Sequence, residues 1–263
     1  MPSPSVLLLR TAGTNCDLET QFAFESAGAE VAPVHVKALC DKPARLEEHR
    51  ILVLPGGFSY GDDLGSGVVL AHEIEQRLLE PFRKFIERGG LALGICNGFQ
   101  VLVKTGLLPG PTYRSGDGGW AATLTFNDSR RFEDRWVALR VADSRSPFLA
   151  GAAGRLVTFP VAHAEGKFVA RDAGVLRRLL DSRQAAFRYV TREGAKPAYP
   201  ENPNGSEEDL AGVTDETGRV LGLMPHPERH VLPWQHPRWT REGLREEGDG
   251  MFLFRNAVAF AKG

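Results

Sequence analysis

The sequence predicts an α/β fold built on a mostly parallel sheet, with an added set of antiparallel strands. In the N-terminal part, short apolar runs alternate with longer segments of helical periodicity. These runs are continuously apolar, which is typical of parallel strands covered by helices on both faces. Beyond Pro109 the runs are shorter, half-polar and separated by polar turns, which indicates antiparallel strands.

The elements of the N-terminal part follow from these runs in order. We expect strands at Val6–Leu9, Val31–Val36, Ile51–Leu54 and Leu91–Ile95. We expect helices at Asp17–Ala27, Val68–Arg88 and Phe99–Lys104. Gly28 ends the first helix, and Gly89 and Gly90 end the second, since glycine readily closes a helix.

The C-terminal part has a different hydrophobic pattern, in which most of the expected elements are strands. Strands are expected at Thr123–Phe126, Trp136–Val141, Leu156–Val161 and Ala186–Val190. Val213–Thr214 and Val220–Met224 form a predicted hairpin, and Met251–Ala261 a final amphipathic helix. Polar segments at Pro200–Asp209 and Pro233–Asp249 are expected to be surface loops. Without internal repeats or a low-complexity linker, residues 1–263 are predicted to form a single domain.

Composition narrows the function classes. A formal net charge of -1 and a hydrophobic fraction of 42% give no reason to expect binding to nucleic acid or to an acidic membrane. The apolar runs are too short for a membrane span, and no signal peptide is recognisable, so we expect a cytoplasmic protein. The 3 cysteines (Cys16, Cys40 and Cys96) are widely spaced, which argues against a disulfide framework.

Cys96 is the candidate nucleophile. It lies in Gly94-Ile-Cys-Asn-Gly98, between a predicted strand and a predicted helix, which is the pattern of a nucleophile elbow. The tight turn would lift the sulfur above the carboxyl end of the sheet, and the flanking glycines would permit unusual dihedral angles and close backbone approach. The amides at the start of the helix would favour the thiolate.

A buried, idle thiol is the alternative for any intracellular cysteine. The elbow favours catalysis for Cys96, whereas Cys16 and Cys40 lack such a setting. Cys16, near the end of the first strand, is expected at most to line the pocket.

His226 and Glu228 are the candidate base and its orienting acid. They follow a predicted strand in Met224-Pro-His-Pro-Glu228. The two prolines predict an extended backbone, which would place both side chains on one face. Glu228 would then fix the imidazole tautomer and stabilise its cation. A solvated loop histidine is one alternative, and a metal site with His230 is another, although the prolines argue against the helix that such a pair needs.

The third expected component is an oxyanion hole. Leu54-Pro-Gly-Gly57 follows a strand, and its glycine pair can present the N–H of Gly57 opposite the N–H of Asn97. Thioester formation and hydrolysis both pass through an oxyanion that such preset donors stabilise.

Together these residues resemble the triad pattern of class I glutamine amidotransferases. The narrower resemblance is to the phosphoribosylformylglycinamidine synthase family, whose motifs span most of the chain. The matching segments are Gly13-Thr-Asn-Cys-Asp17, Pro55-Gly-Gly-Phe-Ser-Tyr-Gly-Asp62, Cys96-Asn-Gly-Phe-Gln100, His163-x-Glu165-Gly166 and Met224-Pro-His-Pro-Glu-Arg229. Ala164 stands where the family often has glycine. Gly61–Gly67 and Tyr199–Gly205 look more like the glutaminase domain of the long single-chain enzymes.

The resemblance implies a flavodoxin-like domain that hydrolyses glutamine through a Cys96 thioester. Gln100 matches a family position that holds glutamine, and Gly56 and Phe58 are assigned to the same substrate site. The ammonia would pass to a large synthetase subunit, with or without a small accessory subunit. No phosphate-binding glycine motif is present, so this chain is expected to need no cofactor or metal, and ATP and Mg²⁺ would belong to the partner.

Two other functions compete with this interpretation: a glutaminase of another amidotransferase, such as one for anthranilate or guanylate synthesis, and a cysteine hydrolase of related fold. The contexts of Cys96 and His226 disfavour both. Trp234 and Trp239 either dock on the synthetase or cover the chain's own core.

Overall fold

Nine strands form one mixed sheet in the computed structural model, which describes residues 3–113 and 119–263. The strands of this sheet lie in the order β2-β1-β3-β4-β11-β10-β9-β6-β7, and β5 and β8 form a separate pair. The first strands in the chain are β1 (Ser5–Arg10), β2 (Glu30–His35), β3 (Ile51–Leu54) and β4 (Leu91–Ile95). The later ones are β5 (Ala122–Thr125), β6 (Glu133–Val141), β7 (Leu156–His163), β8 (Lys167–Ala170), β9 (Ala185–Val190), β10 (Leu210–Thr214) and β11 (Val220–Leu223).

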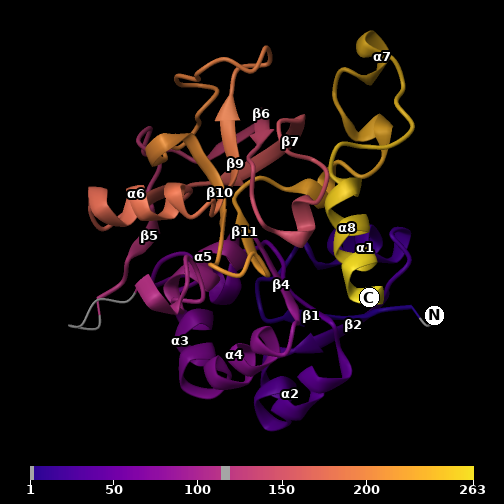
Figure 1. Cartoon of the computed structure of the whole chain (residues 1–263), viewed down its shortest axis with the longest axis vertical. Coiled ribbons are helices and arrows are strands. Elements are labelled where there is room, and N and C mark those ends of the chain that lie inside the picture. Colours follow the sequence, from indigo (N-terminus) through magenta and orange to yellow (C-terminus); the bar gives the residue numbers. More distant parts are fainter. Residues whose placement is uncertain (1–2, 114–118) are drawn as a thin grey trace.

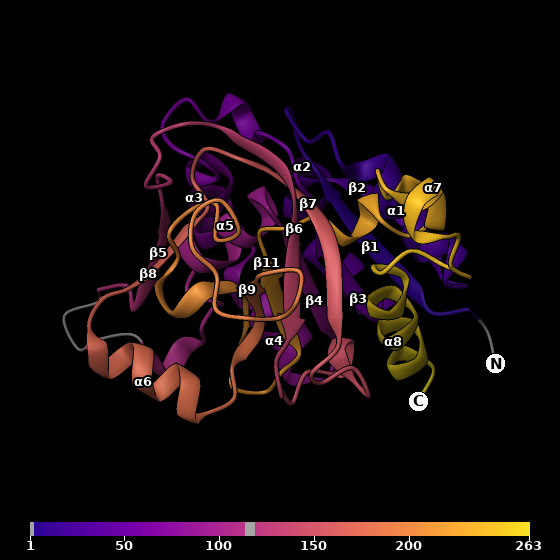
Figure 2. The same cartoon turned by 90° about the horizontal axis from the view of Figure 1, so that it is seen from above.

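The parallel half of the sheet contains β2, β1, β3, β4 and β11. Every residue of β3, β4 and β11 is buried, as expected for strands covered on both faces. Helices α1 (Asp17–Ser26) and α8 (Met251–Lys262) cover one face, whereas α3 (Val68–Arg77) and α5 (Asn97–Lys104) cover the other (Figure 2). Figure 1 shows α1 beside α8, where the rings of Phe24 and Phe254 meet edge to face at 5.0 Å.

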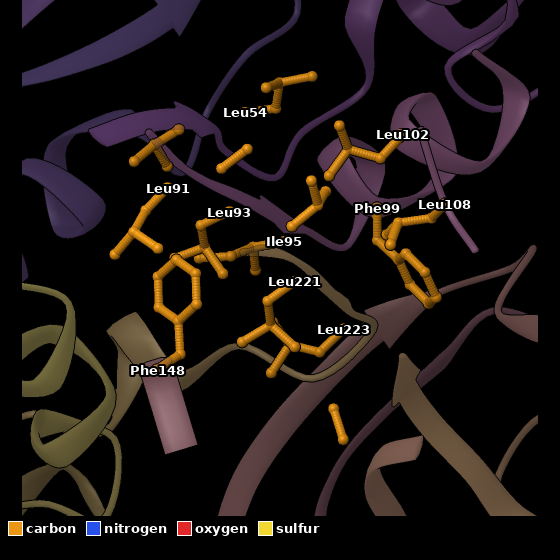
Figure 3. Close-up of a cluster of buried hydrophobic side chains, with 14 of the residues drawn as sticks. Leu54, Leu91, Leu93, Ile95, Phe99, Leu102, Leu108, Phe148, Leu221 and Leu223 are labelled. Carbon is orange, nitrogen blue, oxygen red and sulfur yellow. The ribbon is translucent and has the colours of Figure 1, made fainter. Parts of the chain in front are cut away.

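The core is densest around β4, between β3 and β11. Figure 3 shows aliphatic side chains of these strands packed against Phe99 and Leu102 of α5 on one side and Phe148 on the other. Phe99 also stacks on Phe168 of β8, with ring centroids 6.5 Å apart. This packing holds α5, which begins directly after Cys96, in a fixed position on the sheet.

The antiparallel half joins β11 through β10 to β9, β6 and β7. The predicted hairpin is confirmed, although β10 begins at Leu210, three residues before the predicted start. The strand expected at Thr123–Phe126 is shifted to Ala122–Thr125 and pairs only with β8. β7 continues to His163, two residues beyond the predicted end.

The prediction of one helix over Val68–Arg88 is wrong. The segment forms α3 and α4 (Leu79–Glu87), with Leu78 between them at φ −126° and ψ −8°. The physical reason is Pro81, which has no N–H to donate and would clash inside a continuous helix but fits the first turn of α4.

Four short elements were not predicted: β8, α2 (Val36–Asp41), α6 (Ala173–Asp181) and α7 (Trp239–Glu242). Asp172 caps the start of α6, since its carboxylate accepts a hydrogen bond from Val175 N at 2.9 Å. Within the described residues, no helix is long and apolar enough to cross a membrane.

Candidate active site

Three adjacent strands bring the predicted site together. β3, β4 and β11 are parallel neighbours, so their carboxyl ends lie at the same edge of the sheet. The Gly56–Gly57 turn follows β3, Cys96 follows β4, and His226 follows β11. The Cys96 N–H donates to Leu223 O at 2.8 Å and so connects the ends of β4 and β11.

The turn at Cys96 has the strained backbone of a nucleophile elbow. Cys96 itself has φ 50° and ψ −105°, whereas neither Gly94 nor Gly98 has a positive φ. The expectation that the glycines supply the unusual dihedrals is therefore wrong. Their role is close approach, because a Cβ on Gly98 would lie 1.8 Å from Leu54 O and one on Gly94 would lie 2.7 Å from Gly98 O.

His226 and Glu228 form a buried hydrogen-bonded pair. Nδ1 of His226 lies 2.6 Å from Oε1 of Glu228, and the two residues are 1% and 0% exposed. The backbone between them is not extended as predicted, because Pro227–Arg229 forms a 3-10 turn that begins at Pro227. The alternative of a solvated loop histidine is excluded by this burial.

The electrostatic setting of His226 favours its cation. Burial lowers the pKa of His226, but Glu228 and Cys96 outweigh it, and the pKa lies well above 6.5. Nε2 of the ring is buried and has no hydrogen-bond partner among the described residues. This nitrogen is therefore available to exchange a proton at Cys96 or with a leaving group.

The backbone at Gly57 is held in place. Gly57 has φ +145°, and a Cβ there would lie 2.6 Å from Gly13 O. The peptides on either side are anchored: Phe58 N donates to Gly13 O at 2.9 Å, and Gly56 O accepts from Cys16 N at 3.2 Å. A preset donor needs such rigid flanks.

A cavity of about 170 Å³ lies beside Cys96. Gly57, Phe58 and Gln100, all predicted site residues, line it together with Cys96. Gly56 does not line this cavity, because it lies behind the turn, where a Cβ would be 2.9 Å from both Cys16 Sγ and His226 Cε1.

Hydrogen bonds connect Asn97 and Gln100 to the segments that line the cavity. Asn97 Nδ2 donates to Gln100 Oε1 and to Asp62 Oδ1, both at 3.1 Å, and Asn97 Oδ1 accepts from Ser59 N at 3.2 Å. Gln100 Nε2 donates to Glu165 O at 2.6 Å. These bonds hold the start of α5 against the cavity.

Three ionisable lining residues were not singled out as site residues from the sequence: Asp62, His163 and Glu165. The signal was available, since all three lie in the segments that carry the family resemblance. Cys16 was expected at most to line the pocket, yet it lies behind the histidine. Its Sγ is 3.9 Å from His226 Nδ1 and accepts from Arg229 Nη2 at 3.1 Å.

A metal pair of His226 and His230 has no support in the geometry. Nδ1 of His230 is hydrogen-bonded to Thr158 O at 2.7 Å, and Nδ1 of His226 to Glu228. Among the described residues, one group has metal-ligand composition: Cys16, His226 and Glu228, whose ligand atoms lie within 4.8 Å of one another. Two of its members already serve each other as hydrogen-bond partners.

Comparison with known proteins agrees with this geometry. Residues 3–261 match the model of the CobB/CobQ-like glutamine amidotransferase domain. The chain is 48% identical over 263 residues to a phosphoribosylformylglycinamidine synthase subunit PurQ of Dehalococcoides mccartyi, covering 100% of this chain and 99% of the relative. The corresponding subunit of Archaeoglobus fulgidus is 41% identical over 97% of this chain and 96% of its own length. Relatives of matching length are thus separate subunits.

Solved structures show the same fold. The structure of PurLQS from Thermotoga maritima matches with a TM-score of 0.74 and 33% identity, covering 98% of this chain and 99% of that one. The glutaminase domain of Trypanosoma brucei CTPS, at 12% identity and a TM-score of 0.56, covers 99% of this chain and 94% of that domain, and shows the fold alone. The predicted flavodoxin-like amidotransferase fold is confirmed.

Proposed function

Because this chain belongs to the family of CobB/CobQ-like glutamine amidotransferase domains, we propose that it is the glutaminase subunit of a phosphoribosylformylglycinamidine synthase. It hydrolyses glutamine to glutamate and ammonia, within a single domain. The observation that carries this proposal is the buried pair of His226 and Glu228, which follows the strand adjacent to that of Cys96, with Cys96 lining a small cavity.

The chemistry follows from the positions of these groups. His226 takes the proton of the Cys96 thiol, and the sulfur attacks the side-chain amide carbon of glutamine to form a C–S bond. His226 then delivers this proton to the nitrogen as the C–N bond breaks and ammonia leaves. In the second step, His226 takes a proton from the water that attacks the thioester carbon. It returns this proton to the sulfur as the C–S bond breaks, which releases glutamate and the free thiol. Glu228 keeps Nδ1 of His226 protonated throughout, so Nε2 is the nitrogen that exchanges the proton.

The oxyanion of each step is assigned to the N–H groups of Gly57 and Asn97. The anchored peptides around Gly57 and the position of Asn97 as first residue of α5 support this assignment. Losing one such donor typically costs about 100-fold or more in turnover. Gln100 and Phe58 would contact the bound glutamine, whereas Gly56 would keep the turn close to His226.

The ammonia is delivered to a synthetase subunit that converts formylglycinamide ribonucleotide to formylglycinamidine ribonucleotide. The Thermotoga maritima structure is of PurLQS, and we propose that this chain likewise joins a synthetase subunit and a small accessory subunit. ATP and Mg²⁺ are assigned to the synthetase, since this sequence has no phosphate-binding glycine motif. A cytoplasmic location is proposed as well, supported by the free thiols of Cys16, Cys40 and Cys96.

The Cys96→Ala variant tests this division of labour. In complex with the synthetase, it should lose glutamine-dependent amidation completely and retain amidation with added ammonia. Loss of both activities would contradict the proposal that the synthetase carries the amidation site. A wild-type chain that hydrolyses glutamine but supports no amidation of formylglycinamide ribonucleotide would point to another amidotransferase pathway.

A thiol-directed glutamine analogue tests the triad itself. It should label Cys96 in the wild type and label the His226→Ala variant far more slowly. Equal labelling rates would remove His226 from the proposed mechanism. An analogue of an unrelated amino acid that labels Cys96 equally well would favour a general cysteine hydrolase.

A further inference from the structure

His163 is a buried histidine in the wall of the glutamine cavity to which no role has been assigned so far. It is the last residue of β7 and is 3% exposed. Its ring packs directly against Gly166, where an added Cβ would lie 2.4 Å from the ring atom Cε1. The preceding residue, Ala162, accepts a weak hydrogen bond from the Cys96 thiol, with Sγ 3.7 Å from the carbonyl oxygen.

The tautomer of His163 is fixed by Asn127. The Oδ1 atom of Asn127 accepts from the backbone N–H of Gly166 at 3.0 Å, and Nδ2 donates to the carbonyl oxygens of Arg131 and His163, both at 2.9 Å. The amide orientation is therefore set by backbone groups. Nδ1 of His163 lies 3.1 Å from Oδ1, which can only accept, so Nδ1 must carry the proton.

Nε2 of His163 is consequently a bare lone pair. It is buried and has no hydrogen-bond partner in residues 3–113 and 119–263. Burial and the charge of His226 lower the pKa of His163 to about 3, so the ring stays neutral in the working range of an enzyme. A buried acceptor without a donor is costly, and a ligand that brings an N–H would satisfy it.

We propose that His163 is a specificity-determining residue, whose Nε2 accepts a hydrogen bond from the side-chain amide N–H of bound glutamine. The inference rests on the glutaminase function proposed above and adds to it the means of distinguishing glutamine from its product. The carboxylate of glutamate has only acceptor oxygens, so it would face the lone pair of Nε2 without a proton between them. A site built around a substrate N–H discriminates strongly against analogues that lack it.

The amide is favoured over the α-ammonium of glutamine by the layout of the cavity. The carboxylates of Asp62 and Glu165 line the same cavity and suit an ammonium group. His163 instead follows Ala162, the residue in contact with the Cys96 sulfur, and so lies near the reacting end. Because it is neutral and weakly basic, Nε2 can accept a hydrogen bond from the departing ammonia without taking up its proton.

Glutamate γ-methyl ester is the probe that tests this. It forms the same thioester as glutamine but has no N–H at the reacting end. Hydrolysis of both substrates is measured with the assembled synthetase complex, for the wild type, His163→Phe and His163→Met. Each apolar variant should lower the ratio of kcat/KM for glutamine to kcat/KM for the ester at least about tenfold. Inhibition by glutamate should become tighter relative to the KM for glutamine.

Two controls separate this role from packing. His163→Gln, which retains an acceptor oxygen, should keep the ratio within about threefold of the wild type. His49→Phe replaces another buried histidine, hydrogen-bonded to Ser5 Oγ, and should leave the ratio unchanged. Ammonia-dependent amidation by each complex reports whether the variant chain still folds and docks.

The outcomes are distinct. A wild type without glutaminase activity would refute the proposed function itself. An active wild type, together with apolar variants that slow both substrates by the same factor, would overturn only the role of His163. Because Phe and Met differ in shape, a folding failure in one leaves the other to decide.

Discussion

The surroundings of two buried histidines in the candidate active site, His226 and His163, shift their pKa values in opposite directions. Glu228 and Cys96 hold the pKa of His226 well above 6.5, whereas burial and the charge of His226 take that of His163 to about 3. Such a divergence separates roles within a site. One ring is set to exchange protons, and the other can only accept a hydrogen bond.

At this scale we predict that Glu228→Gln lowers kcat for glutamine hydrolysis about 100-fold or more. Glu228 raises the pKa of His226, so its loss lowers that pKa. The alkaline limb of the pH profile of kcat/KM should therefore move to lower pH. The matched control is Glu19→Gln, which removes the partner of Arg229 Nε at 3.1 Å and should leave the profile in place. An unmoved profile in Glu228→Gln would contradict the assignment.

The lowered pKa of His163 also predicts that the stability of the chain depends on pH. Its pKa is about 3 in the folded chain and ordinarily 6.5, so between these pH values the unfolded chain binds a proton at this residue and the folded chain does not. The contribution of neutral His163 to the free energy of unfolding is fully present above pH 6.5 and is lost as the pH falls towards 3. From pH 6.5 to pH 4 this costs about 3 kcal/mol of the free energy of unfolding. Urea titrations at both pH values should show a loss in His163→Phe that is smaller than the loss in the wild type by about this amount, since other buried histidines contribute equally to both.

At the scale of elements, the elbow depends on how closely α5 approaches β3. Gly98 lies on Leu54 O so tightly that an added Cβ would be 1.8 Å away, against backbone that cannot swing aside. The same contact fixes the Asn97 amide relative to the turn after β3. Gly98 is therefore needed both for the packing of α5 on the sheet and for the position of the Asn97 N–H.

We predict that Gly98→Ala lowers the free energy of unfolding by about 3 kcal/mol and abolishes glutaminase activity. Gly174→Ala is the control, since Gly174 lies in the exposed helix α6 and its added Cβ would meet only the Asp172 carboxylate at 3.1 Å. That change should be neutral or slightly stabilising. Thermal unfolding and glutamine hydrolysis of both variants decide the matter, and a Gly98→Ala chain as stable as the control would refute the close-contact argument.

At the scale of the whole molecule, the loop that carries Trp234 and Trp239 lies outside the core. The two residues are 55% and 42% exposed, so they are not buried in the chain's own core. Exposed tryptophans are costly in water and are frequent binding hot spots. This exposure favours the docking interpretation of the loop.

We expect the double variant Trp234→Ala, Trp239→Ala to weaken binding to the synthetase on the order of tenfold or more. Glutamine hydrolysis by the isolated chain should not change, because neither residue lines the cavity beside Cys96. Leu18→Ala, at a 73% exposed apolar residue of α1, is the control. Titration calorimetry measures all three affinities, and unchanged binding of the double variant would exclude the loop from the interface.

The sequence alone was sufficient for the four parallel strands of the N-terminal part. Continuous apolar runs at Ile51–Leu54 and Leu91–Ile95 specify buried strands, and both are found at those positions. Prediction failed where local and tertiary effects compete. Pro81 breaks a helix whose periodicity continues past it, and four-residue β8 is stable only because it pairs with β5.

For the site, the sequence determined which residues take part. Two local patterns identified them: a cysteine flanked by glycines between a strand and a helix, and the run His-Pro-Glu. Local patterns of this kind can be recognised from the order of the residues. Only the tertiary structure decided what lies behind and around these residues. Cys16 meets His226 because β1 is a neighbour of β3, and His163 meets Asn127 because the end of β7 lies beside the loop after β5. These contacts depend on strand order and long-range packing, which one-dimensional patterns do not encode.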